Sequence, residues 1–151
     1  MAEITLLPLI QEAVKSAMRN HDKEVVTTLR MAISELKKEE IDNRVTLDDA
    51  FVISILQRMI KQRKDAASQF QEANRPELAD KERNEITMLS DFLPEQMSEE
   101  DLMQVVKQEI ISSDASSMQD IGKVMGSLKL KLLGKADMST VSRLVKEQLS
   151  Q

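Results

Sequence analysis

The sequence DIGKVMGSLKLKLLGKADMSTVSRLVKEQL, residues 120–149, holds all three glycines of the chain. On either side of Gly134, apolar residues recur at intervals of three and four positions, a spacing typical of amphipathic helices. Glycine often ends a helix because it adopts the left-handed conformation at little cost. This stretch therefore predicts two helices that separate at Gly134 and bury Ile121, Val124, Met125, Leu128, Leu132, Val141, Leu144, Val145 and Leu149.

The same stretch is basic, although the whole chain has a net charge of −5. Between Ile121 and Lys146 the only acid is Asp137, and six basic residues give the segment a net charge of +5. Positive charge gathered on an acidic protein indicates a polyanionic partner. Two solvated helices without such a partner remain the alternative. The basic residues are Lys123, Lys129, Lys131, Lys135, Arg143 and Lys146.

The composition of the 151 residues predicts an all-α protein. Aromatic residues make up 2%, and strong helix formers such as Ala, Leu, Glu, Lys and Met dominate. Without Cys, the chain has no disulfide, no thiol nucleophile and no Cys-based zinc site. No run approaches the roughly 18 apolar residues of a membrane span, and the start of the chain lacks a signal-peptide pattern. We therefore expect a cytoplasmic protein that makes no membrane contact.

Four further helices are predicted before Pro94. Their apolar residues follow the helical period, and the composition changes at Phe92-Leu93-Pro94. The residue before a proline avoids the α region, so the fourth helix must end there. The four predicted helices lie at about 6–18, 22–43, 49–73 and 77–91.

Two helical domains are therefore expected: an N-terminal four-helix bundle at 1–93 and a C-terminal three-helix module at 94–151. The module opens with a helix that contains Leu102, Val105, Val106 and Ile110. Side-chain caps are expected at several helix starts, because Ser, Thr and Asp accept hydrogen bonds from the free N–H groups there. The predicted caps are Asp22, Thr46 with Asp49, Ser98 with Asp101, Ser117 with Asp120, and Asp137 or Ser139.

The sequence contains no catalytic constellation, and we predict no metal and no cofactor. The single imidazole, His21, falls in a short polar turn, where a solvated role is expected. The runs 38–40 and 99–101 are acidic but suit helix surfaces and helix starts better than a metal site. Arg58, Lys61, Arg63 and Lys64 lie in a domain with a net charge of −3, so local ion pairs are expected there.

Two glycines inside the predicted sixth helix require a reason, because each costs about 1 kcal/mol relative to alanine. At 100° per residue, Gly122, Gly126 and Lys129 form one stripe, with Lys123 and Ser127 on its other flank. Small residues let another group approach the backbone closely. That group is either a neighbouring helix or a sugar-phosphate backbone held by the flanking lysines and by the free N–H groups at helix N-termini.

Three ordered motifs resemble the YqeY family. They are LPEQMSEE at 93–100, KQRKD at 61–65, and DIGKVMG at 120–126 followed by GKAD at 134–137. YqeY proteins are similar to the C-terminal tail of the GatB subunit of the aspartyl/glutamyl-tRNA amidotransferase. The resemblance implies two helical bundles, and it implies a family label of carbon–nitrogen ligase with glutamine as amido donor. Nothing in the chain resembles the catalytic body of that enzyme, so we do not expect ligase activity from this chain alone.

The resemblance also implies a tRNA-facing surface. It would comprise Gly122, Lys123, Gly126, Lys129, Lys131, Gly134 and Lys135, with Arg143 and Lys146 as auxiliaries. Two positions depart from the family pattern: Lys135, where Arg is common, and Met138, where Gly is frequent. Lysine neutralises a phosphate but cannot clasp it with a planar fork.

The leading hypothesis is a non-catalytic protein that binds tRNA or acts in tRNA metabolism through its C-terminal module. No aromatic residue follows Phe92, so base stacking is not expected. The rival is a protein–protein adaptor whose Gly122 and Gly126 face receives a helix of a partner in translation or tRNA amidation. A third alternative is an accessory role in a carbon–nitrogen ligase that uses glutamine.

Overall fold

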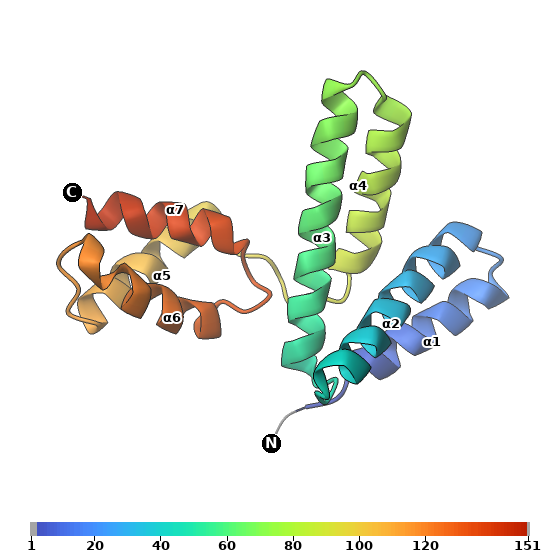
Figure 1. Ribbon diagram of the computed structural model, residues 1–151, viewed down its shortest axis with the longest axis horizontal. Helices are drawn as coiled ribbons and strands as arrows, with labels where there is room; N and C mark the ends of the chain where they lie inside the picture. Colours follow the sequence, from blue (N-terminus) through green and yellow to red (C-terminus); the bar gives the residue numbers. More distant parts are fainter. Residues whose placement is uncertain (1–2, 151) are drawn as a thin grey trace. The chain divides into compact units, whose positions relative to one another are not determined.

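The structure, a computed structural model, describes residues 3–150 and is all-α, as predicted (Figure 1). Within these residues there are seven α-helices, one short 3-10 turn and no strand. The chain divides into two compact units, Met1–Leu93 and Pro94–Gln151, with four helices in the first and three in the second. No helix within residues 3–150 has both the length and the apolar content needed to cross a membrane.

Two helical hairpins build the first unit. Each hairpin turns on a residue in the left-handed conformation, His21 (φ 57°) in the first and Asn74 (φ 58°) in the second. Figure 1 shows the hairpins meeting near the α2–α3 connection and diverging from it, which differs from the regular bundle that the sequence suggested. The helices are α1 (Leu6–Arg19), α2 (Lys23–Asn43), α3 (Asp49–Glu72) and α4 (Pro76–Ser90).

A single apolar core joins all four helices of this unit. Its fully buried side chains include Ile10 of α1, Leu36 of α2, Leu56 of α3 and Leu89 of α4. Burying one such side chain stabilises the fold by about 1.5–3 kcal/mol. These residues hold the two hairpins together toward the ends opposite their turns. Side chains of α2 and α3 that lie closer to the turns line a groove.

The caps of the first unit are partly as predicted. Asp22 accepts a hydrogen bond from the N–H of Val25 (3.3 Å), so the cap predicted for α2 is confirmed. The cap predicted for α3 is wrong, because Asp48 is the N-cap and accepts from Phe51 (2.9 Å). Asp49 is the first helical residue, too early to act as the reciprocal partner in a capping box.

Three helices build the second unit around a separate apolar core. They are α5 (Glu99–Ser112), α6 (Ile121–Lys131) and α7 (Met138–Leu149), and the 3-10 turn η1 (Met118–Asp120) leads into α6. Every residue predicted to be buried on the last two helices is buried or partly buried. The core residues with 1% exposure or less are Val106, Val124, Leu128, Val141, Leu144 and Val145.

Three predicted caps are present in this unit. The hydroxyl of Ser98 accepts from the N–H of Asp101 (3.1 Å). Ser117 and Asp120 form a reciprocal capping box. Asp137, the first of the two candidates offered for α7, accepts from the N–H of Ser139 (2.9 Å).

The α6–α7 connection pairs with the segment that precedes α5. The side-chain amide of Gln96 donates to the carbonyl of Gly134 (2.5 Å), and the N–H of Met97 donates to the carbonyl of Lys135 (2.9 Å). Gly134 is buried and has a φ of 76°, the left-handed conformation expected of it. Two of the motifs that resemble the YqeY family are thus joined by hydrogen bonds.

Candidate nucleic-acid interface

The glycine stripe of α6 is open. Gly122 and Gly126 are exposed, and a β-carbon added to either would have no atom within 4 Å beyond its immediate chain neighbours and helix backbone. A helix of the same unit that crosses there was one explanation for the glycines, and the structure does not contain it. The α6 backbone is therefore accessible to an external partner along this stripe.

An exposed leucine extends the stripe. Leu130 follows Gly126 by four residues and is 83% exposed, the largest fraction among the exposed large apolar residues of the described chain. The predicted stripe included Lys129 and missed Leu130. At 100° per residue, Leu130 lies about 80° from Gly122, so helical geometry alone could have found it. The open face is therefore partly apolar.

Two of the basic residues predicted to contact RNA form ion pairs with acidic residues of the same unit. The ammonium of Lys131 lies 2.5 Å from a carboxylate oxygen of Glu109, a residue of α5 that is only 5% exposed. Arg143 lies 2.6 Å from Glu99 and 2.9 Å from Glu147. The hydrogen bond from Lys131 is the main reason that the pKa of Glu109 is lowered. These two cations have structural partners and are less available to a ligand.

The remaining cations are exposed. Lys123 donates to the backbone carbonyl of Ser113 (2.9 Å), at the C-terminal end of α5. Lys129, Lys135 and Lys146 form no ion pair with another residue of the described chain. Lys129 lies beside the open stripe on α6, Lys135 lies in the α6–α7 connection, and Lys146 lies on α7.

Acidic side chains lie at the starts of both α6 and α7, where the sequence led us to expect free N–H groups facing a phosphate. The carboxylate of Asp120 accepts from the backbone N–H groups of Ser116 (2.8 Å) and Ser117 (3.2 Å) just before α6. The carboxylate of Asp137 accepts from Ser139 at the start of α7. A carboxylate at each position also repels a phosphate, so any anion contact relies on lysine side chains.

The other candidate residues behave as structural groups. His21 is exposed in the α1–α2 turn. Arg58 lies 2.8 Å from Glu35 and 2.9 Å from Glu39, which confirms the local ion pairs expected on α3. Among residues 3–150, no three His, Asp or Glu side chains are grouped as metal ligands.

The fold and this surface define a two-unit helical protein with an open glycine and lysine face on its second unit. The chain belongs to the YqeY family, described as Yqey-like protein, whose sequence pattern it matches over residues 8–149. The resemblance inferred from the three motifs is therefore confirmed.

Similar proteins occur in fungi. The mitochondrial protein named altered inheritance of mitochondria protein 41 from Vanderwaltozyma polyspora is 29% identical over 89% of this chain and 70% of its own length. Its namesake from Pyrenophora tritici-repentis is 26% identical over 96% of this chain and 81% of its own length. The uncharacterized protein C22F3.15 of Schizosaccharomyces pombe is 34% identical over 62% of this chain and 76% of its own length. The relatives whose names give a location are mitochondrial, and the cytoplasmic location expected for this chain stays a prediction.

Proposed function

We propose that this protein is a non-catalytic tRNA-binding protein and that its C-terminal unit makes the contact. The observation that carries the proposal is the open stripe of Gly122 and Gly126, with Lys123 and Lys129 beside it. Half or more of protein–nucleic acid hydrogen bonds go to the sugar-phosphate backbone, which must come close to the protein. The similarity of the YqeY family to the tail of a tRNA-dependent amidotransferase supports tRNA as the nucleic acid.

Recognition would depend on shape and charge. The second unit contains no Phe, Tyr or Trp, so unstacked bases have no aromatic side chain to stack on. Lysine acts as a point charge on phosphate and does not form a bidentate contact. Because Lys131 and Arg143 are held by acids, the cations assigned to phosphate contacts are Lys123, Lys129, Lys135 and Lys146.

The test is a fluorescence anisotropy titration of labelled deacylated tRNA with the intact chain at several salt concentrations. We expect saturable binding whose affinity falls by roughly 0.9 log units per log unit of salt for each duplex phosphate neutralised. The charge reversals Lys129→Glu and Lys135→Glu together should weaken binding and reduce the salt slope by about 2. Both side chains are exposed and unpaired, so the fold should tolerate the change.

A matched control carries the same charge change elsewhere. Lys15→Glu with Lys107→Glu reverses two exposed lysines that lie outside the basic segment. This control should retain most of the affinity for tRNA. Equal loss in both double variants would show that only the overall charge matters, and it would remove the assignment to α6 and the α6–α7 connection.

The second candidate function is a protein–protein adaptor, and the exposed Leu130 favours it. Two glycines followed by a leucine at four-residue spacing form a face that a partner helix could pack against closely. A helix contact of this kind depends weakly on salt, whereas phosphate contacts depend on it steeply. Leu130→Ala leaves every charge in place, so it should weaken an adaptor contact while leaving the tRNA titration almost unchanged.

A further inference from the structure

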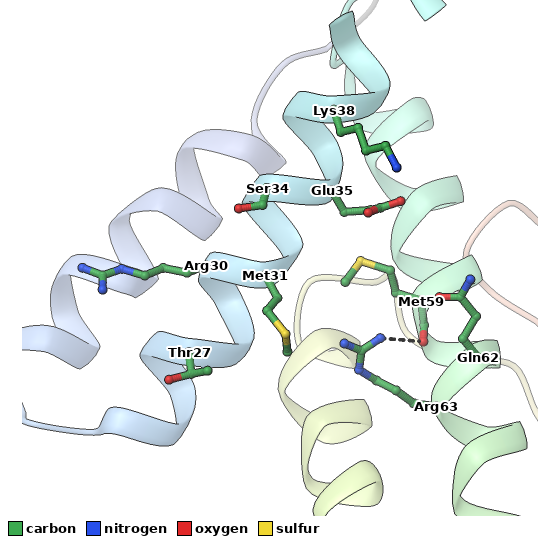
Figure 2. Close-up of a pocket in the computed structure, with 9 residues that line it drawn as sticks. All are labelled: Thr27, Arg30, Met31, Ser34, Glu35, Lys38, Met59, Gln62 and Arg63. Atoms are coloured by element: carbon green, nitrogen blue, oxygen red, sulfur yellow. Dashed lines mark hydrogen bonds between the residues drawn. The ribbon is translucent and has the colours of Figure 1, made fainter. Parts of the chain in front are cut away.

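A groove lies between α2 and α3 in the first unit, where the two hairpins diverge (Figure 2). Its volume is about 770 Å³, within the range of small-molecule sites. It shares no residue with the surface assigned to tRNA. The groove is lined by Thr27, Arg30, Met31, Ser34, Glu35, Lys38, Met59, Gln62 and Arg63.

The most buried charge in the groove belongs to Arg63, whose side chain is only 14% exposed. One of its N–H groups, on Nη1, donates to the carbonyl of Met59 (3.1 Å). The Nε atom is buried and has no hydrogen-bond partner in the described chain. A guanidinium has five N–H donors. Because Nε is buried on the side of Glu85, the donors left for a ligand are the N–H groups of Nη2 and the second N–H of Nη1.

The nearest acid satisfies Arg63 only in part. A carboxylate oxygen of Glu85 on α4 lies 3.7 Å from Nε, too far for a hydrogen bond. Glu85 is itself only 7% exposed, and burial raises the pKa of its carboxyl group. The other acid, Glu35, is held by Arg58 at 2.8 Å and does not pair with Arg63.

The charge of the lining favours an anion. Arg30, Lys38 and Arg63 are positive and Glu35 is negative, which gives the lining a net charge of +2 in a unit whose net charge is −3. Figure 2 shows Lys38 on the α2 side of the groove and Arg63 on the α3 side, while Arg30 points away from α3. Arg30 donates to the sulfur of Met18 (3.4 Å), a weak acceptor.

Two thioethers provide an apolar wall beside Arg63. Met31 on α2 is 40% exposed and Met59 on α3 is 5% exposed, and Figure 2 shows both side chains directed into the space between the helices. Methionine is flexible and polarisable, so it adapts to apolar groups of different shape. An ion without an apolar part would leave this wall unused.

We infer that the α2–α3 groove binds a small organic carboxylate that has an apolar body. The carboxylate lies against the free edge of Arg63, with Lys38 and the amide of Gln62 at the rim. The apolar body lies between Met31 and Met59. Bidentate, charge-assisted hydrogen bonds from a guanidinium hold a carboxylate strongly and in a fixed orientation, and the Nη groups of Arg63 supply the donors.

The test uses the full chain and three simple probes in an NMR titration that follows backbone amide shifts. Hexanoate has both a carboxylate and an apolar chain, acetate has the carboxylate alone, and hexanol has the apolar chain alone. We expect hexanoate to shift the amides of Ser34, Gln62 and Arg63 and to bind at least about ten-fold more tightly than either other probe. Equal binding of hexanol would show a merely apolar crevice, and equal binding of acetate would show a merely cationic one. Either result, or no shift at the groove, overturns the inference.

Two variants test the assigned residues. Met31→Glu places a negative charge in the groove at an exposed position and should weaken hexanoate binding by about ten-fold or more. The control Ile41→Glu makes the same charge change on α2, at a residue that is 73% exposed and outside the groove. It should leave the affinity within about two-fold.

Loss of Arg63 alone would leave Glu85 buried without a cation, so it is replaced together with that acid. The double variant Arg63→Gln with Glu85→Gln keeps the buried pair neutral and should also weaken hexanoate binding by about ten-fold or more. Unchanged hexanoate affinity in this double variant, or in Met31→Glu, would show that hexanoate does not bind at Arg63 in this groove.

Discussion

Asp49, at the start of α3, caps the N-terminus of α1 through Thr5. One of its carboxylate oxygens accepts from the backbone N–H of Thr5 (2.7 Å), and the other accepts from the hydroxyl of Thr5 (2.5 Å). The N–H of Leu6 also donates to this carboxylate (2.8 Å). The first N–H of α1 and the N–H of its N-cap residue, Thr5, thus find their acceptor in a side chain that lies 43 and 44 residues away.

We predict that Asp49→Ala destabilises the first unit by about 1–2 kcal/mol, because the backbone N–H groups of Thr5 and Leu6 at the start of α1 lose their acceptor. The free energy of unfolding from a urea titration measures the loss. Asp42→Ala removes a carboxylate from an exposed position on α2 and should change stability by less than about 0.5 kcal/mol. A loss at Asp49 no larger than that of the control would show that solvent caps α1 equally well.

Local and distant contacts were predicted with different success. The caps by Asp22, Ser98, Ser117 and Asp137 join residues at most three positions apart. A few consecutive residues of the sequence are therefore enough to predict them. The partners of Asp49, Lys131 and Gly134 are 44, 22 and 38 residues away. Helical periodicity predicts which face of each helix is buried, but it contains no information about which polar side chains two packed helices bring together.

The candidate surface shows the same division. The glycine stripe follows from helical spacing, and the structure shows that it is open. The pairing of Lys131 with Glu109 and of Arg143 with Glu99 depends on how α5 packs against α6 and α7. A net charge counted along the sequence therefore overstates the charge available to a ligand.

The ion pair between the buried Glu109 and the exposed Lys131 predicts a pH dependence of stability. The hydrogen bond from Lys131, with further hydrogen bonds from Ser127 and Ser113, lowers the pKa of Glu109 in the folded protein. The unfolded chain then binds a proton more readily than the folded one as the pH falls. The contribution of ionised Glu109 to folding stability is fully present above the pKa of Glu109 in the unfolded chain, about 4.5. It is lost as the pH falls through the lower pKa that Glu109 has in the folded protein.

We predict that Lys131→Met destabilises the second unit at neutral pH by about 1–3 kcal/mol, because Glu109 keeps its charge but loses its cation. The difference from the unmodified chain should shrink below about pH 4.5, where Glu109 is protonated in the unfolded chain. Hydrogen exchange of the α6 core amides, from neutral pH to below about pH 4.5, measures this difference in stability. Lys129→Met, at an exposed and unpaired lysine, is the control, and an equal loss there would contradict the role of the pair.

Replacing Gly134 or Gly126 with alanine should change the stability of the second unit in opposite directions. Gly134 has a φ of 76°, which a residue with a β-carbon adopts at a cost, so Gly134→Ala should destabilise the second unit by about 1 kcal/mol or more. Gly126 is helical, and a β-carbon there meets no atom within 4 Å. Gly126→Ala should therefore stabilise the unit by about 0.5–1 kcal/mol. Thermal unfolding of the two variants, followed by circular dichroism, tests both signs at once.

The substitution Gly126→Ala also distinguishes an effect on stability from an effect on tRNA binding. If a partner approaches the α6 backbone along the stripe, the added β-carbon of Gly126→Ala must weaken that contact although the protein is more stable. We expect tRNA affinity to fall about three- to ten-fold in the anisotropy titration, and further for Gly126→Leu, whose larger side chain covers the backbone. Ser112→Leu, a substitution at the exposed end of α5, controls for the added apolar surface and should retain tRNA affinity. Full affinity in Gly126→Leu would place the contact elsewhere on the second unit and leave the glycine stripe without a role in binding tRNA.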